Sequence, residues 1–363
     1  MQNIMRTKEQ IVQQKDQIMH QYPVGLIGYG LGGSIFHAPM IAAIPGLLLA
    51  RIASRRTSPD VLQAYPGVSL DETPQAMFDD PAIALVVVCT PNASHFELAR
   101  AALRAGKHVV VDKPFVLSSA EGDELVALAR ERGLKLSVYQ NRRWDGDFLT
   151  VRQAVASGEL GAIHTYRAHF DRYAPEVKVR WKEQAQPGAG VLWDLGSHLI
   201  DQALQLFGTP RSVTAHLSVQ RQGAQVEDAF ELVLDHGACR SMLHAGALVR
   251  APGPRYAVHG TQGSFVKYGI DPQEDALKLG KRPGDAGWGH DDPASYATIT
   301  GTDGASRVVE TIPGAYESFY RGVHEAIAQG SDVPVTADDA VDVVRVIELA
   351  LRSHRERRTI DFA

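Results

Sequence analysis

Asp194 and His198 are the residues whose spacing indicates acid–base chemistry most clearly. They lie four positions apart in segment 191–198, which places a carboxylate and an imidazole on one face of a helix. Lys113 precedes Pro114, which favours an extended backbone for the lysine, so that its side chain can point across a crevice. Each feature alone is also common in a structural role, as a helix cap, a surface hydrogen bond or a solvated charge.

A glycine pattern near the N-terminus could bind a dinucleotide. Gly28, Gly30 and Gly33, with Leu31 between them, form G-x-G-x-x-G directly after the apolar run 24–27 and before a helical segment. In such a loop the first glycine permits a tight turn, the second lets the backbone approach a pyrophosphate, and the third lets the helix pack on the strand. The helix N-terminus then receives the negative charge. This context predicts a dinucleotide site.

The end of the second predicted strand indicates which dinucleotide is bound. An NAD site usually has an Asp or Glu about 20 residues after the glycines, to bind the ribose hydroxyls. Here the strand ends in Ser54, Arg55 and Arg56, and no acid appears before Asp60. A serine and two arginines can hold a 2′-phosphate through charge-assisted hydrogen bonds. We therefore expect NADP rather than NAD, the alternative being that both arginines are solvated loop charges.

Polar residues also follow the next two strands of the pattern. Thr90, Pro91, Asn92 and His95 come after the predicted strand 84–89, and Lys113 comes after the predicted strand 108–111. Ligands bind at the carboxyl ends of parallel strands, so we expect these residues to contact the cofactor.

The first part of the chain alternates apolar runs with segments of helical period. Such alternation predicts a parallel sheet covered on both faces. The expected strands are 24–29, 47–53, 84–89, 108–111 and 134–138, and the expected helices are 34–43, 93–105 and 118–132.

After about residue 141 the pattern changes to longer runs that alternate apolar and polar residues, which is typical of an antiparallel sheet with one exposed face. The predicted fold class is therefore α/β, with a Rossmann dinucleotide-binding domain followed by an α+β domain that has an open, mainly antiparallel sheet. We expect an N-terminal extension (1–22), a cofactor domain (23–141) and a substrate and oligomerisation domain (142–363). Predicted strands of the second domain are 163–173, 211–220, 227–235, 239–249 and 256–259; predicted helices are 147–156, 190–207, 316–329 and 337–354.

Composition excludes several classes of protein. The 363 residues include 37 basic and 42 acidic side chains, a net charge of −5, so nothing favours a nucleic-acid or membrane partner. Two distant cysteines and scattered histidines show no metal-binding spacing, and we expect no metal in the chemistry. The N-terminus lacks a secretory signal pattern, so we expect a cytoplasmic protein.

Together these residues resemble the Gfo/Idh/MocA family of oxidoreductases, which carries an N-terminal GxGxxG, a TPN-x-x-H, an (E/D)KP lysine and a D-x-x-x-H helix. The resemblance covers nearly the whole chain from Pro23 and is strongest to NADP-dependent scyllo-inositol dehydrogenases. Asp112 replaces the commoner Glu of the EKP motif without touching the expected chemistry. The likeness to these scyllo-inositol dehydrogenases rests on segments 28–33, 36–39, 141–145, 170–173 and 266–269.

The resemblance implies roles for these residues. His198 would take the alcohol proton, Lys113 would stabilise the developing alkoxide, and Asp194 would fix a substrate hydroxyl and the neighbouring charges. Which of Lys113 and His198 accepts the proton stays open at this level. Side chains expected to bind the substrate are Arg143, Trp144, Asp171 and Tyr173 together with Asp194 and His198.

The expected reaction is NADP-dependent interconversion of a cyclitol alcohol and its ketone, scyllo-inositol and scyllo-inosose, with an aldose or another sugar as the alternative substrate. A non-enzymatic sensor of the same fold would be expected to lose the lysine or the histidine, and both are present. A glycosidase that retains its nicotinamide would turn over aryl glycosides without net NADPH formation. The resemblance also implies a homodimer or homotetramer formed through the C-terminal sheet.

Overall fold

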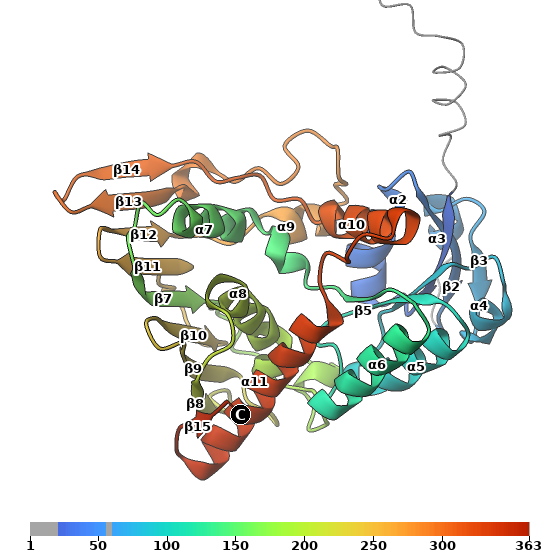
Figure 1. Cartoon of the computed structure of the whole chain (residues 1–363), viewed down its shortest axis with the longest axis horizontal. Helices are drawn as coiled ribbons and strands as arrows, with labels where there is room; N and C mark the ends of the chain where they lie inside the picture. The colour runs from blue at the N-terminus through green and yellow to red at the C-terminus, as the bar shows by residue number, and fades with distance from the viewer. Residues whose placement is uncertain (1–20, 56–59, 363) are drawn as a thin grey trace, which may run out of the picture.

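Two β-sheets with flanking helices make up the protein in the computed structural model, which describes residues 21–55 and 60–362 (Figure 1). Most of the predicted N-terminal extension and Arg56 lie outside these residues. Within the described part of the chain, no helix combines the length and apolar character needed to cross a membrane.

The first sheet has six parallel strands in the order β3-β2-β1-β4-β5-β6, as expected for a Rossmann domain. Its centre is apolar because helices cover both faces: all four residues of β4 are buried. The short β3 was not expected from the sequence. The strands are β1 (Tyr22–Ile27), β2 (Leu47–Ala53), β3 (Ser69–Asp71), β4 (Leu85–Val88), β5 (His108–Val111) and β6 (Leu136–Val138).

The three predicted helices of this domain are confirmed, whereas α3 and α4 were not predicted. Ser118, the first residue of the predicted helix 118–132, caps α6 and forms a capping box with Glu121. The helix after the glycine loop begins with a wider π-helical turn before it becomes α-helical. The elements are η1 (Gly32–His37), α2 (Ala38–Ala42), α3 (Asp60–Ala64), α4 (Gln75–Asp79), η2 (Asn92–Ser94), α5 (His95–Arg104) and α6 (Ser119–Glu131).

The second sheet has nine strands in the order β14-β13-β12-β11-β7-β10-β9-β8-β15. Its β7–β10 pair is parallel and its other pairs are antiparallel, which confirms a mainly antiparallel sheet. The strands are β7 (Ile163–His169), β8 (Ser212–Ser218), β9 (Ala229–Asp235), β10 (Arg240–Gly246), β11 (Tyr256–Gly260), β12 (Gly263–Lys267), β13 (Ala297–Gly301), β14 (Ser306–Val309) and β15 (Ile360–Asp361).

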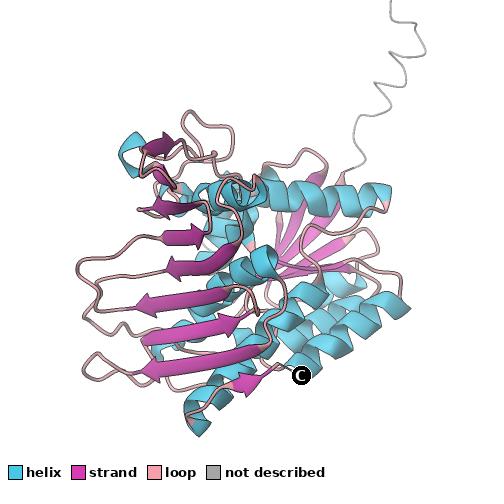
Figure 2. Ribbon diagram, turned by 60° about the vertical axis from the view of Figure 1, so that its left-hand side comes forward, coloured by secondary structure: helices cyan, strands magenta, loops and turns pink. Residues whose placement is uncertain are grey.

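Helices α7, α8 and α11 pack on one face of the second sheet, and Figure 2 shows the strands from the opposite side. The C-terminal helices also reach the first domain: Phe319 and Tyr320 of α10 share a buried core with Val87 and Val110. The first core therefore draws on residues far beyond position 141. The helical elements are η3 (Asn141–Trp144), α7 (Gly146–Ala156), η4 (Trp181–Glu183), η5 (Leu192–Gly196), α8 (Ser197–Phe207), α9 (Gln273–Lys278), η6 (Pro293–Ser295), α10 (Glu317–Gln329) and α11 (Ala337–Glu356).

Candidate active site

A cavity of about 1090 Å³ lies at the carboxyl ends of β1, β2, β4 and β5 and extends to η5 and α8 of the second domain. The glycine loop forms one part of its wall, and Lys113, Asp194 and His198 form another. The structure thus brings residues from three distant parts of the sequence to one cavity. Its place at the strand ends is the usual position of a ligand site in a Rossmann sheet.

The backbone of the glycine loop fits a dinucleotide. Gly28 has φ +96°, and a Cβ there would stand 2.0 Å from the carbonyl oxygen of Cys89. A Cβ on Gly33 would stand 2.1 Å from the carbonyl oxygen of Gly28, so only glycine allows this close packing of helix on strand. A Cβ on Gly30 would meet nothing within 4 Å, since this residue faces open space. That space is where a pyrophosphate could approach the backbone.

Most of the residues predicted to bind the cofactor line the cavity. Ser54 and Arg55 lie at the end of β2, and Arg55 is exposed. Arg56 falls outside the described residues. The other predicted residues in the lining are Gly28, Gly30, Leu31, Thr90, Pro91 and Lys113.

Asn92 and His95 are buried and do not belong to the described cavity lining. The Asn92 amide donates to the carbonyl oxygen of Gly188 at 2.9 Å. The two ring nitrogens of His95 lie 2.9 Å from the carbonyl oxygens of Thr90 and Pro114. These contacts brace the loops after β4 and β5, so His95 positions the cavity wall.

Two lysines share the carboxylate of Asp194. The Lys113 ammonium donates to the Asp194 carbonyl oxygen at 2.6 Å and to its Oδ1 at 3.1 Å, and the Lys182 ammonium donates to Oδ1 at 2.6 Å. Burial alone would raise the pKa of Asp194, but both lysines hold it well below its usual range. Burial lowers the pKa of Lys113. Asp194 is therefore a fixed anion that holds two cations beside the cavity.

His198 is oriented by Gln140. The Nδ1 atom of His198 lies 3.2 Å from the Oε1 atom of Gln140, and because an amide oxygen only accepts, this contact favours the tautomer with the proton on Nδ1. Burial, followed by the charges of Lys113 and Arg142, lowers the pKa of His198 well below its usual value. The imidazole is therefore neutral at neutral pH and its Nε2 atom is free to accept a proton.

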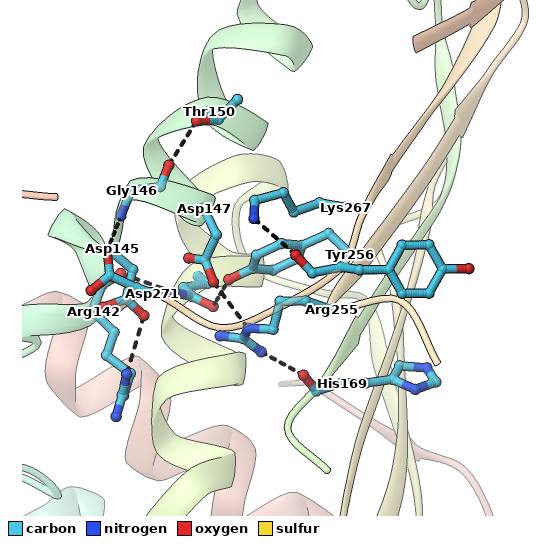
Figure 3. Close-up of polar contacts among 12 residues, drawn as sticks. Arg142, Asp145, Gly146, Asp147, Thr150, His169, Arg255, Tyr256, Lys267 and Asp271 are labelled. Atoms are coloured by element: carbon cyan, nitrogen blue, oxygen red, sulfur yellow. Dashed lines mark hydrogen bonds and ion pairs between the residues drawn. The ribbon is translucent and has the colours of Figure 1, made fainter. Parts of the chain in front are cut away.

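Arg142 enters the cavity wall from a buried network of carboxylates, part of which Figure 3 shows. Its guanidinium contacts Asp145 at 3.3 Å and Glu274 at 2.5 Å. The hydroxyl of Tyr316 donates to Asp145 at 2.6 Å. Burial raises the pKa of Asp145 to about 6, although Arg142 opposes that shift. Asp271 accepts a hydrogen bond from the Gly146 amide at 2.6 Å in the same network.

Four residues that were predicted to bind the substrate are not among the described residues that line the cavity. Arg143 forms a buried ion pair with Asp201 and a second, partly exposed one with Asp339, and Trp144 packs edge-on against the ring of Phe319. Asp171 contacts two histidines on the second sheet, and the ring of Tyr173 lies under the guanidinium of Arg250.

Other polar residues in the lining were not predicted from the sequence. The segment 172–182 contributes three cations and Trp181, and it has too little regular periodicity to predict its position. In segment 141–145, the arginine that lines the cavity is Arg142 and not the predicted Arg143. The unpredicted charged residues of the lining include Glu72, Glu97, Arg142, Arg172, Arg180, Lys182 and Glu274. Gln140, the partner of His198, was also not predicted and lies outside the lining.

Comparisons with known proteins agree with this architecture. Sequence models of the oxidoreductase family match residues 22–140 as its NAD-binding Rossmann fold and residues 152–362 as its C-terminal α/β domain. The chain is 45% identical over 340 residues to scyllo-inositol 2-dehydrogenase (NADP(+)) IolW of Bacillus subtilis, covering 93% of this chain and 95% of that protein. It is 46% identical over 343 residues to the oxidoreductase YdgJ of Escherichia coli, covering 94% and 98% respectively.

A solved structure of the oxidoreductase YvaA from Bacillus subtilis has a TM-score of 0.92 to this chain at 43% identity and covers 94% of this chain and 99% of that one. Sequence models and fold agree over both domains. The chain belongs to the Gfo/Idh/MocA family of oxidoreductases, with an NAD(P)-binding Rossmann domain followed by the family's C-terminal α/β domain.

Proposed function

We propose that this enzyme interconverts a secondary alcohol of a cyclitol and the corresponding ketone with NADP, and that scyllo-inositol and scyllo-inosose are its substrate pair. The observation that carries the proposal is the meeting of Lys113, Asp194 and His198 with the glycine loop in one cavity. The B. subtilis relative that is 45% identical is named for this activity, which supports the choice of substrate.

When bound, the nicotinamide cofactor supplies the acceptor for the hydride that leaves the alcohol carbon. The protein must remove the hydroxyl proton, and the Nε2 atom of neutral His198 takes it. The ammonium of Lys113, held by Asp194, donates a hydrogen bond to the reacting oxygen and stabilises negative charge there. The proton acceptor that the sequence left open is thus assigned to His198.

The cavity wall supports a substrate that carries many hydroxyl groups. A cyclitol has no charge, so recognition depends on hydrogen bonds from fixed polar side chains. Arg142, Arg172 and Lys182 provide such donors in the lining, and Asp194 and Glu274 provide acceptors. We therefore assign substrate contact to these residues and not to the four predicted positions outside the lining.

A substrate screen tests the proposed function. Inositol isomers and aldoses are offered with NADP and with NAD, and absorbance of the reduced cofactor is followed. The expected result is highest kcat/KM with scyllo-inositol and NADP. An enzyme that oxidises only aldoses would contradict the cyclitol assignment, and release of aryl aglycones without NADPH formation would indicate the glycosidase reaction instead.

Arg55 is expected to set the preference for NADP. A charged hydrogen bond to the 2′-phosphate contributes about 1.5–3 kcal/mol, and each 1.4 kcal/mol is tenfold in affinity. Arg55→Ala should weaken NADP binding roughly 10- to 100-fold and change NAD binding little, as measured by titration of cofactor fluorescence. Arg104→Ala, an exposed arginine outside the lining, is the control. Equal use of both cofactors by the unmodified enzyme would contradict the assignment, and would favour Glu72 as a ligand of the ribose hydroxyls.

The pH dependence of kcat/KM should report the electrostatics of His198. A proton acceptor works in its neutral form, and the pKa of His198 is lowered well below 6.5, first by burial and then by nearby cations that include Lys182. Activity should therefore stay high as the pH falls through 6.5. Lys182→Met removes one of these cations and raises the pKa of His198, so the acid-side decrease should move to higher pH. If kcat/KM of the unmodified enzyme and of Lys182→Met decreased at the same acidic pH, this assignment would be contradicted.

We propose that the exposed face of the second sheet forms a homodimer or homotetramer contact. Side chains on this face alternate with the buried ones along the strands, as Arg240 and Met242 alternate with Ser241 and Leu243 in β10. The face opposite helices α7, α8 and α11 is open in the single chain, so a second copy of the chain can cover it. Light scattering at micromolar concentration should give a multiple of the chain mass of 39.5 kDa, and a monomer would contradict the proposal.

A further inference from the structure

His169, Asp171 and His244 form a polar cluster on the second sheet, away from the cavity. His244 of β10 pairs in register with His169, the last residue of β7, across the parallel strand pair. Asp171 follows two residues after His169, and residues two apart in an extended chain point to the same face. The buried neighbours Ala168 and Phe170 point into the core, so the cluster lies on the opposite, exposed face.

The three side chains converge on a small volume. Nδ1 of His244 lies 2.7 Å from Oδ1 of Asp171, and Nδ1 of His169 lies 3.4 Å from its Oδ2. One atom of each residue lies within 4.8 Å of the others. The Asp171 side chain is only 4% exposed, while the two imidazoles are 30% and 27% exposed. In the single chain, a nearly buried carboxylate thus lies between two imidazoles that solvent can still reach, on the same sheet face that is proposed above as the oligomer contact.

Two imidazole nitrogens and one carboxylate oxygen are ligands that suit a borderline divalent cation. Zinc bonds to such atoms are about 2.0–2.2 Å long, which in a tetrahedron separates neighbouring ligand atoms by about 3.4 Å. The distance between Nδ1 of His169 and Oδ2 of Asp171 has this value. The shorter contact between Nδ1 of His244 and Oδ1 of Asp171 is a hydrogen bond, which a bound metal ion would replace. We propose that His169, Asp171 and His244 bind one divalent transition-metal ion such as Zn²⁺, with solvent in the remaining position.

The surroundings favour a cation at this point. Glu231 of β9 stands opposite His244 in the antiparallel register and adds a negative charge beside the cluster. Arg255, a buried cation of the Figure 3 network, donates to the backbone carbonyl oxygen of His169, and the imidazole of His169 points away from it. Gly253 passes close to His169: a Cβ there would stand 3.8 Å from Nδ1 of His169.

The ion would join β7 to β10, the parallel pair near the middle of the second sheet, and its role is therefore structural. The site is independent of the proposed reaction, since its three ligands lie outside the lining of the described cavity. Sequence spacing could not indicate it, because the ligands on β10 and β7 are brought together only by strand pairing.

Calorimetric titration of untagged, chelator-treated protein with Zn²⁺ tests the site. We expect one Zn²⁺ per chain, and His244→Gln and Asp171→Asn should each weaken its binding at least about 10-fold. His164→Gln, which removes an exposed histidine of β7 outside the cluster, should bind like the unmodified protein. Absence of a one-to-one site, or Asp171→Asn binding as tightly as the unmodified protein, would overturn the proposal.

A second measurement avoids variants that fold poorly. Side-chain nitrogen NMR of the unmodified protein should show Zn²⁺ shifting the Nδ1 signals of two histidines, and the assignments should be His169 and His244. Shifts confined to other histidines would overturn the proposal. Because the cavity is not involved, turnover measured with and without Zn²⁺ should be equal, so failure here is distinguishable from failure of the proposed function.

Discussion

Replacing Lys113 or His198 by alanine is expected to lower turnover by about 10²- to 10⁴-fold, the range for loss of a general acid–base group. His198→Ala removes the proton acceptor, and Lys113→Ala removes the hydrogen bond to the reacting oxygen. The affinity of His198→Ala for NADP should stay within a few-fold of that of the unmodified enzyme. Steady-state kinetics with scyllo-inositol, together with cofactor binding and thermal unfolding of each variant, measure these effects.

Lys281→Ala is a suitable control for both substitutions, since Lys281 is exposed and lies outside the described cavity lining. It should leave turnover and melting temperature unchanged. If either active-site variant folds normally and retains near-normal turnover, the assigned chemistry is wrong. If the variants lose only melting temperature and keep their activity per folded molecule, these residues pack and cap their elements and do no chemistry.

Asp194→Asn is expected to reduce kcat/KM by on the order of 10²-fold, because the two lysines lose the anion that holds them and a small displacement of a catalytic group has a cost of this size. We expect kcat to fall, because Asp194 positions Lys113, and KM to rise, because Asp194 also offers an acceptor to the substrate. The pKa of Asp194 lies well below its usual range, so the unmodified carboxylate stays charged down to low pH. Steady-state kinetics at several pH values measure the separate effects on kcat and KM.

Lys182→Met separates these two roles of Asp194. It removes one cation from the carboxylate but leaves the Lys113 contact at 3.1 Å available. We expect Lys182→Met to lower kcat/KM less than Asp194→Asn does. Equal and complete loss in both variants would show that Lys182 is as necessary as Lys113, and normal KM in Asp194→Asn would contradict a substrate contact by the carboxylate.

The fold follows from local patterns that the sequence carries directly. The run Leu85–Val88 is apolar at every position, as a strand covered on both faces requires, and β4 occupies it. Ser118 and Glu121 form a capping box at the start of the predicted helix 118–132. Packing of α10 on the first domain could not be predicted, because the apolar face of a helix does not reveal which core it joins.

The candidate site was predictable where a motif fixes backbone geometry. Gly28 and Gly33 lie where close contacts exclude any other residue, and Lys113 reaches Asp194 across 81 positions of sequence. Side-chain direction was not predictable in irregular segments. The turn of η3 directs Arg142 into the cavity wall and its neighbour Arg143 toward the buried Asp201, although both belong to one motif.

The position of Lys182 illustrates the same limit. It lies in a long connection between β7 and η5 that has little periodic structure, and only the folded chain brings it to Asp194. Asp171 points away from the cavity because adjacent residues of an extended chain face opposite sides, and Arg172 takes the cavity side.

Transfer of a labelled hydrogen tests the central claim most directly. scyllo-Inositol carrying deuterium on its ring carbons is incubated with the enzyme and NADP, and the reduced cofactor is examined by NMR and mass spectrometry. The account predicts one deuterium per turnover in NADPH, at C4 of the nicotinamide, with scyllo-inosose formed in equal amount. Consumption of the cyclitol without labelled NADPH, or no turnover of scyllo-inositol while a sugar substrate transfers its label, would contradict it.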